Sequence, residues 1–233
     1  MSMLADVAAI GFDVDNTLYD QNQHALFAFA KLSASLSEGT GLPSEVIRRK
    51  LVDAWLEKTS YYPNLFDDVL NELGIWSRER IAFLVSGLHN HVGPLELYPG
   101  TGELLQSLSG TYPLFIVTDG NSGMQRRKID RLEVAHLFSS IVCTGEHPSA
   151  WRKPSPDPFL LAVQELRIPA DKCLYVGDNP LCDFVGAHSV GMKVVRVLTG
   201  PFAGLPSPAS VRLYGIIHML RDLPTLLTPR AEI

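Results

Sequence analysis

The sequence predicts an α/β protein in which a doubly wound parallel sheet carries an inserted block of helices. Short apolar runs recur along the chain, and helical patterns follow most of them. Nearly continuous β-branched and aromatic runs are typical of strands covered on both faces, and their alternation with helices favours a parallel sheet. The stretch from Gln21 to Leu97 interrupts this alternation, because only helical patterns occur in it.

The apolar runs are expected to form the strands of the sheet. They are Val7 to Phe12, Leu114 to Val117, Ile141 to Val142, Leu174 to Val176 and Val194 to Val197, with a further strand expected near Val211 to Tyr214. Between them, apolar residues at helical spacing predict helices over the ranges Gly123 to Leu132, Asp157 to Leu166 and Pro180 to Val190.

The interrupting stretch is expected to fold as a separate helical domain. Gly74 and the segment Gly39 to Pro43 divide its helical patterns, and Pro43-Ser44-Glu45 is a typical helix start. We therefore predict that residues 21–97 form an inserted helical domain, and that residues 1–20 and 98–233 together form the core domain.

Composition limits the classes of partner. The 233 residues are 46% hydrophobic and 19% charged, which fits a packed globular protein. A net charge of −5 argues against binding to a nucleic acid polymer. There is no apolar run of the roughly 20 residues needed to span a bilayer, and no secretory signal pattern. The three cysteines have no CxxC spacing and are expected to be reduced thiols, so we expect a cytoplasmic protein of undetermined oligomeric state.

Acidic, hydroxyl and amine side chains follow the predicted strands. Asp13 and Asp15 follow the first strand, the segment Thr118 to Gly120 ends the second, and Asp178 ends the fourth. Lys153 stands shortly before a predicted helix start. Ligands of open parallel sheets bind beyond the carboxyl ends of the strands, so these groups are expected to converge on one pocket.

The short pattern Asp13-x-Asp15-x-Thr17 is weak when taken alone. Two acids in a turn can simply accept hydrogen bonds from backbone amides, and a match of this length also arises by coincidence. The order of the later groups, each at a strand end or before a helix start, favours a single functional site over that alternative.

The complete set of motifs resembles the haloacid dehalogenase-like (HAD) hydrolase superfamily, in the branch with a helical cap inserted after the first motif. The matching motifs are Asp13-Val14-Asp15-Asn16-Thr17, Thr118, Lys153 and Gly177-Asp178 with Asp183. The resemblance implies a Rossmann-like core and a helical cap domain. Asn16 and Asp119 depart from the glycine and asparagine that are commonest at those places.

The resemblance implies hydrolysis of a phosphate ester. Asp13 would attack phosphorus and form an aspartyl-phosphate, while Asp15 would protonate the leaving oxygen and then activate water. Lys153 would screen the repulsion between Asp13 and the phosphate. The groups implied to hold the phosphoryl oxygens are Thr118 and the backbone amides of Asp119 and Gly120.

A magnesium ion is also implied by the resemblance. The carboxylates of Asp13 and Asp178 and the backbone carbonyl of Asp15 would bind it, and Asp183 would orient a metal-bound water or Lys153. The implied substrate is a small phosphorylated metabolite, such as a sugar phosphate, a nucleotide or a phosphoglycolate-like acid. Tyr19 follows the first motif and is expected to line the substrate pocket.

Other activities on the same scaffold stay open. A haloacid dehalogenase needs no acid for a halide leaving group and typically lacks the second aspartate, whereas Asp15 is present here. A phosphomutase would share the core motifs, and an inactive binding protein would be expected to have lost an acid. The basic segment Arg126 to Lys128 is expected to be a solvated helix face, or else to assist with an anionic substrate.

Overall fold

The computed structural model describes residues 4–58, 62–91 and 93–227. The chain forms two compact units, which are described separately because each has its own core. The core unit comprises Met1–Asp20 and Glu96–Ile233, and the helical unit comprises Gln21–Leu95.

The core unit is built on a sheet whose described strands are all parallel, in the order β3-β2-β1-β4-β5-β6. The strands are β1 (Ala9–Phe12), β2 (Leu114–Thr118), β3 (Ser140–Cys143), β4 (Cys173–Gly177), β5 (Lys193–Val197) and β6 (Leu213–Ile217). This is a doubly wound arrangement, and the predicted fold class is confirmed.

Strand β1 lies at the centre of the sheet between β2 and β4. All of its residues are buried, as the apolar run predicts for a strand covered on both faces. The edge strand β6 begins at Leu213, later than expected, because the amide of Val211 donates to the carbonyl of Pro208 and closes a turn there.

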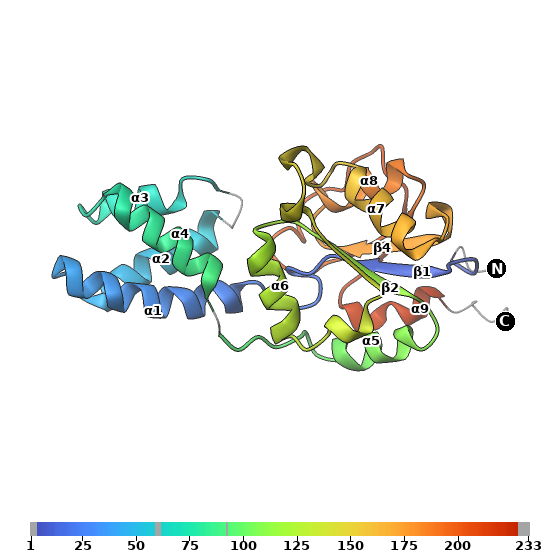
Figure 1. Cartoon of the computed structure of the whole chain (residues 1–233), viewed down its shortest axis with the longest axis horizontal. Coiled ribbons are helices and arrows are strands. Elements are labelled where there is room, and N and C mark those ends of the chain that lie inside the picture. Colours follow the sequence, from blue (N-terminus) through green and yellow to red (C-terminus); the bar gives the residue numbers. More distant parts are fainter. Residues whose placement is uncertain (1–3, 59–61, 92, 228–233) are drawn as a thin grey trace. The chain divides into compact units, whose positions relative to one another are not determined.

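Helices cover both faces of the sheet, with α7 and α8 on one face and α5 and α9 on the other (Figure 1). The helices are α5 (Thr101–Ser109), α6 (Ser122–Arg131), α7 (Asp157–Leu166), α8 (Asp183–Ser189) and α9 (Pro224–Leu227). Short 3-10 helices occur at Ala135–Leu137, Thr144–Glu146, Ser149–Trp151, Ala170–Lys172 and Leu220–Asp222. Phe159 of α7 and Phe184 of α8 pack with Phe115 and Tyr175 in the main apolar cluster.

The helical unit consists of α1 (Asn22–Thr40), α2 (Ser44–Lys58), α3 (Leu65–Glu72) and α4 (Arg78–Asn90). Local chemistry explains its helix ends: Gly41 ends α1 in the left-handed conformation, and the Ser77 hydroxyl accepts the amide of Arg80 at 3.2 Å and caps α4. Phe29 and Trp55 pack edge to face in a core of their own.

Among the helices of the described residues, none is long and apolar enough to cross a membrane.

Candidate active site

The site lies where the sheet reverses its winding, between β1 and β4. Asp13 follows β1 directly and Asp178 follows β4, and the amide of Asp13 donates to the carbonyl of Val176 at 3.0 Å. Oxygens of Asp13, Asp178 and Asp183 lie within 4.8 Å of one another, and all three side chains are buried. The carboxyl ends of two neighbouring strands thus bring together acids that are far apart in the sequence.

Lys153 is the cation among these acids. Its buried ammonium donates to Asp13 Oδ1 at 2.6 Å and to Asp183 Oδ1 at 2.7 Å. Burial acts to lower the pKa of Lys153, but the charges of Asp13 and Asp183 outweigh it and raise that pKa well above the usual value. Lys153 therefore stays charged and partly balances the buried carboxylates.

The single positive charge of Lys153 does not balance the negative charges of the buried carboxylates. Burial raises the pKa of Asp13 from 3.8 to about 7, although Lys153 opposes the shift. Burial and the charges of Asp183 and Asp13 raise the pKa of Asp178 well above its usual value. The chain alone therefore disfavours ionising these acids together, and a further positive charge is needed.

The donor set fits a hard divalent cation. Asp178 Oδ2 is buried and has no hydrogen-bond partner among the described residues. Asp183, in contrast, uses both carboxylate oxygens: one accepts from Lys153 and the other accepts the amide of Asn179 at 2.8 Å. Carboxylates of Asp13 and Asp178 are thus suited to bind an ion such as Mg²⁺, while Asp183 is committed to holding Lys153.

Asp15 has a different environment from Asp13. Its Oδ1 accepts the Tyr19 hydroxyl at 2.6 Å and Lys128 Nζ at 2.7 Å. Its Oδ2 accepts Lys128 Nζ at 2.9 Å and Gln125 Nε2 at 3.1 Å. Burial acts to raise the pKa of Asp15, but the charge and the hydrogen bond of Lys128 outweigh it and lower that pKa. The two acids of the first motif are thus held in opposite electrostatic surroundings.

The segment Thr118 to Gly120 forms the next wall of the site. Thr118 is buried, and its hydroxyl accepts Gln125 Nε2 at 2.5 Å. Asp119 Oδ1 accepts the backbone amide of Lys153 at 3.1 Å, so this carboxylate fixes the segment that carries the lysine. Gly120 has a φ of 126°, a conformation that side-chain-bearing residues rarely adopt.

The turn after β1 explains one departure from the family pattern. Asn16 has a φ of 58°, in the left-handed region that glycine adopts freely and asparagine tolerates better than most residues. Gly200 lies against it, since a Cβ at Gly200 would come within 2.6 Å of Asn16 Cβ. The Thr199 hydroxyl also donates to the Asn16 carbonyl. The loop after β5 therefore braces the first motif.

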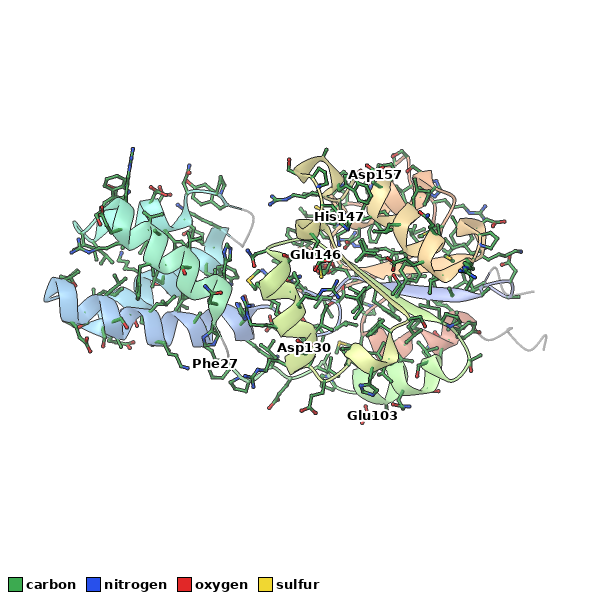
Figure 2. The ribbon with its side chains drawn as sticks, in the orientation of Figure 1. Phe27, Glu103, Asp130, Glu146, His147 and Asp157 are labelled. Carbon is green, nitrogen blue, oxygen red and sulfur yellow. The ribbon has the colours of Figure 1, made fainter. Side chains whose placement is uncertain are left out.

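The interpretation of the segment Arg126 to Lys128 as a solvated face is wrong for Lys128, which is 5% exposed. Gln125, which belongs to none of the motifs, is fully buried. The sequence pattern could have indicated that both residues are buried, because Gln125 and Lys128 lie on the same helical face as the apolar Ile129 and Leu132. Arg126 differs, since it is half-exposed and pairs with Glu146 at 2.9 Å, a residue labelled in Figure 2.

The structure thus places Lys153 in one buried cluster with the acids Asp13, Asp178 and Asp183. It also joins Asp15 to Thr118 through Gln125. Tyr19 is fully buried, and its hydroxyl lies on Asp15. Its role as a wall of the substrate pocket stays a prediction, and so do the catalytic and metal-binding roles of the other residues.

The sequence profile of the haloacid dehalogenase-like hydrolases matches residues 10–197. The chain therefore belongs to this family, as its motifs indicate, and is a hydrolase. Among solved structures, a HAD-hydrolase from Bacillus subtilis has a TM-score of 0.71 at 20% identity, covering 96% of this chain and 99% of that one. At this identity the likeness concerns the fold.

Curated relatives are similar over most of their length. A glyceraldehyde 3-phosphate phosphatase from Methanopyrus kandleri is 30% identical over 84% of this chain and 86% of the relative. A glyceraldehyde 3-phosphate phosphatase from Pyrococcus abyssi is 30% identical over 93% of this chain and 92% of the relative. A phosphoglycolate phosphatase from Escherichia coli O157:H7 is 26% identical over 86% of this chain and 84% of the relative.

Proposed function

We propose that the chain is a magnesium-dependent phosphoric monoester hydrolase that acts on a small phosphorylated metabolite through an aspartyl-phosphate on Asp13. The observation that carries the proposal is the convergence of Asp13, Lys153 and Asp178 at the adjoining ends of β1 and β4. The phosphatase names of the curated relatives support the same class of reaction.

Asp13 is suited to be the nucleophile. Its Oδ1 is held by Lys153 at 2.6 Å, and the side chain is buried at the end of β1. A carboxylate oxygen of Asp13 would attack phosphorus, so that the P–O bond to the alcohol breaks as the bond to Asp13 forms. Lys153 would reduce the repulsion between this carboxylate and the phosphate.

Asp15 is suited to move the proton. Its protonated form, which Lys128 disfavours, would deliver a proton to the departing oxygen. The resulting carboxylate would then accept a proton from the water that hydrolyses the aspartyl-phosphate, which restores the protonated form. The Thr118 hydroxyl and the amides of Asp119 and Gly120 would hold the phosphoryl oxygens. The presence of Asp15 two positions after Asp13 supports phosphate ester hydrolysis over dehalogenation, which needs no acid.

The ion would be held by the carboxylates of Asp13 and Asp178 and by the backbone carbonyl of Asp15. When bound, Mg²⁺ supplies positive charge that lets the buried acids ionise together and neutralises the phosphoryl group. Asp183 would keep Lys153 in place through its 2.7 Å contact.

The substrate and the role of the helical unit belong to the proposal as well. The helical unit is inserted shortly after Asp15 in the chain, and we assign it as a cap domain that sets substrate choice. Since the curated relatives are named for glyceraldehyde 3-phosphate and phosphoglycolate, these two esters are the first to test. Sugar phosphates and nucleotides complete the panel, and the enzyme is expected in the cytoplasm.

The test is phosphate release by the purified chain from p-nitrophenyl phosphate and from the panel. Activity should disappear with a chelator and return with Mg²⁺. Asp13→Asn should reduce turnover below detection, whereas Asp171→Asn, an exposed acid before β4 at the opposite edge of the sheet, should not. Normal turnover by Asp13→Asn would refute the proposed nucleophile.

A further inference from the structure

Helix α6 carries two polar side chains that face inward, although the rest of their stripe is apolar. Gln125 and Lys128 are buried beside Ile129 and Leu132 on the same face of the helix. Burying an amide and an ammonium is unfavourable unless partners compensate for the lost water. The partners that compensate here are both in the proposed site: Asp15 and Thr118.

We infer that Lys128 and Gln125 are positioning residues that hold the acid–base carboxylate of Asp15 in register with Thr118. This inference rests on the proposed function, because it assigns the two residues to the proton-transfer step of that reaction. Neither residue needs to touch the substrate; both act through Asp15 and Thr118.

Lys128 fixes the orientation of the Asp15 carboxylate. Its ammonium lies 2.7 Å from Oδ1 and 2.9 Å from Oδ2, so it contacts both oxygens of the group. The Tyr19 hydroxyl adds a second contact to Oδ1 at 2.6 Å. A carboxylate that is held at both oxygens cannot rotate about its last bond without breaking a hydrogen bond to a buried cation.

Gln125 couples this carboxylate to the phosphoryl-binding wall. Its Nε2 donates both to Asp15 Oδ2 at 3.1 Å and to Thr118 Oγ1 at 2.5 Å. Because Thr118 accepts this hydrogen bond, the proton of its own hydroxyl is directed elsewhere and is available to a phosphoryl oxygen. The Gln125 amide thereby sets the direction of the Thr118 hydroxyl proton and the position of the Asp15 carboxylate.

The other end of the same amide argues against a purely structural role. Gln125 Oε1 is buried and has no hydrogen-bond partner among the described residues. A buried acceptor without a partner destabilises the fold, so a leucine or methionine would serve packing better at this place. Gln125 is thus explained by what its Nε2 holds rather than by the stability of α6.

The contacts that position Asp15 predict which type of phosphate ester depends on them. An alkyl alcohol is a poor leaving group and requires a well-placed proton donor, whereas p-nitrophenolate leaves without one. Loss of the positioning contacts should therefore affect esters of alkyl alcohols, such as sugar and hydroxy-acid phosphates, more than aryl phosphates.

The experiment compares kcat/KM for two substrates in the full-length chain loaded with Mg²⁺. The substrates are p-nitrophenyl phosphate and the alkyl phosphate that the wild-type chain hydrolyses best in the panel. Lys128→Met should lower kcat/KM about 100-fold on the alkyl ester but less than about 10-fold on the aryl ester. Arg131→Met removes the same charge from an exposed position of α6 and should change neither value. Equal losses on both substrates would overturn the inference.

A double-mutant cycle with Asp15→Asn separates positioning from general damage. If Lys128 acts through Asp15, Lys128→Met should lower kcat/KM no further in the Asp15→Asn background. Independent, additive losses would contradict the inference. If Lys128→Met does not fold, Lys128→Gln keeps a donor without the charge and should show the same substrate dependence with a smaller loss.

The two proposals fail in different ways. Absence of phosphate release by the wild-type chain, or full activity of Asp13→Asn, would refute the proposed function and this inference with it. An active wild type that depends on Asp13 but shows additive losses in the cycle would refute only the positioning role.

Discussion

Replacing the proposed nucleophile with asparagine is expected to stabilise the fold in the absence of metal. Asp13 is buried beside Asp178 and Asp183, and burial raises its pKa from 3.8 to about 7. At about 1.4 kcal/mol per pKa unit, the ionised form therefore costs the native state about 4 kcal/mol. The asparagine in Asp13→Asn would carry no charge, and its side-chain oxygen could still accept from Lys153.

The stability difference between Asp13→Asn and the wild type depends on pH, because the native and unfolded chains bind the Asp13 proton with different affinity. Below about pH 4 Asp13 is protonated in both the native and the unfolded chain, so its ionisation contributes nothing. Between pH 4 and pH 7 the native chain binds the proton more tightly, so the wild-type free energy of unfolding falls as the pH rises. Above pH 7 the full cost is present. Asp13→Asn should thus be more stable than wild type by about 2 to 4 kcal/mol at pH 8, and no more stable near pH 4.

The assay is urea unfolding at both pH values in the presence of EDTA. Asp130→Asn, an exposed acid on α6 that is labelled in Figure 2, is the matched control and should shift stability by less than about 0.5 kcal/mol. Added Mg²⁺ should stabilise the wild type more than the variant, because binding to the native state adds to its stability. A variant that is no more stable than wild type at pH 8 in EDTA would refute the electrostatic reasoning.

Further changes test the metal site, the fourth motif and the loop after β5. Asp178→Asn should raise the Mg²⁺ concentration for half-maximal activity at least about 100-fold, and an unchanged metal titration would exclude Asp178 as a ligand. In Gly177→Ala the new Cβ would lie 2.4 Å from Asp183 Oδ2, so the free energy of unfolding, measured by thermal unfolding, should fall by about 1–3 kcal/mol. Gly39→Ala has open space around the new Cβ and should not be destabilised in the same assay. Arg196→Met removes a buried guanidinium that donates to several carbonyls of the loop after β5. The free energy of unfolding should fall by about 1–3 kcal/mol, and limited proteolysis of that loop should be faster. An unchanged rate of cleavage would contradict this role of Arg196.

Local sequence patterns were sufficient to predict the sheet and the position of most site residues at the ends of its strands. An apolar run followed at once by an acid predicts a buried strand with a carboxylate at its end, and Asp13 and Asp178 both follow this rule. Parallel strands present their carboxyl ends at the same edge, so the convergence of these acids with Thr118 follows from topology. The boundary of β6 was less predictable, because a turn at Val211 replaced the first residues of the expected strand.

The sequence by itself determined the family, the fold class and the candidate nucleophile, because these depend on short motifs and on periodicity within single elements. Tertiary structure alone decided the long-range partners of Asp15, which are Gln125 and Lys128. Lys128 is 113 positions away in the chain, and its contact with Asp15 exists only because α6 packs with that face inward. The hydrogen bond between Asp183 and Lys153 likewise depends on how separate elements pack, because the two residues are 30 positions apart. The identity of a charged residue reveals its chemistry, whereas its partner and its exposure depend on how separate elements pack.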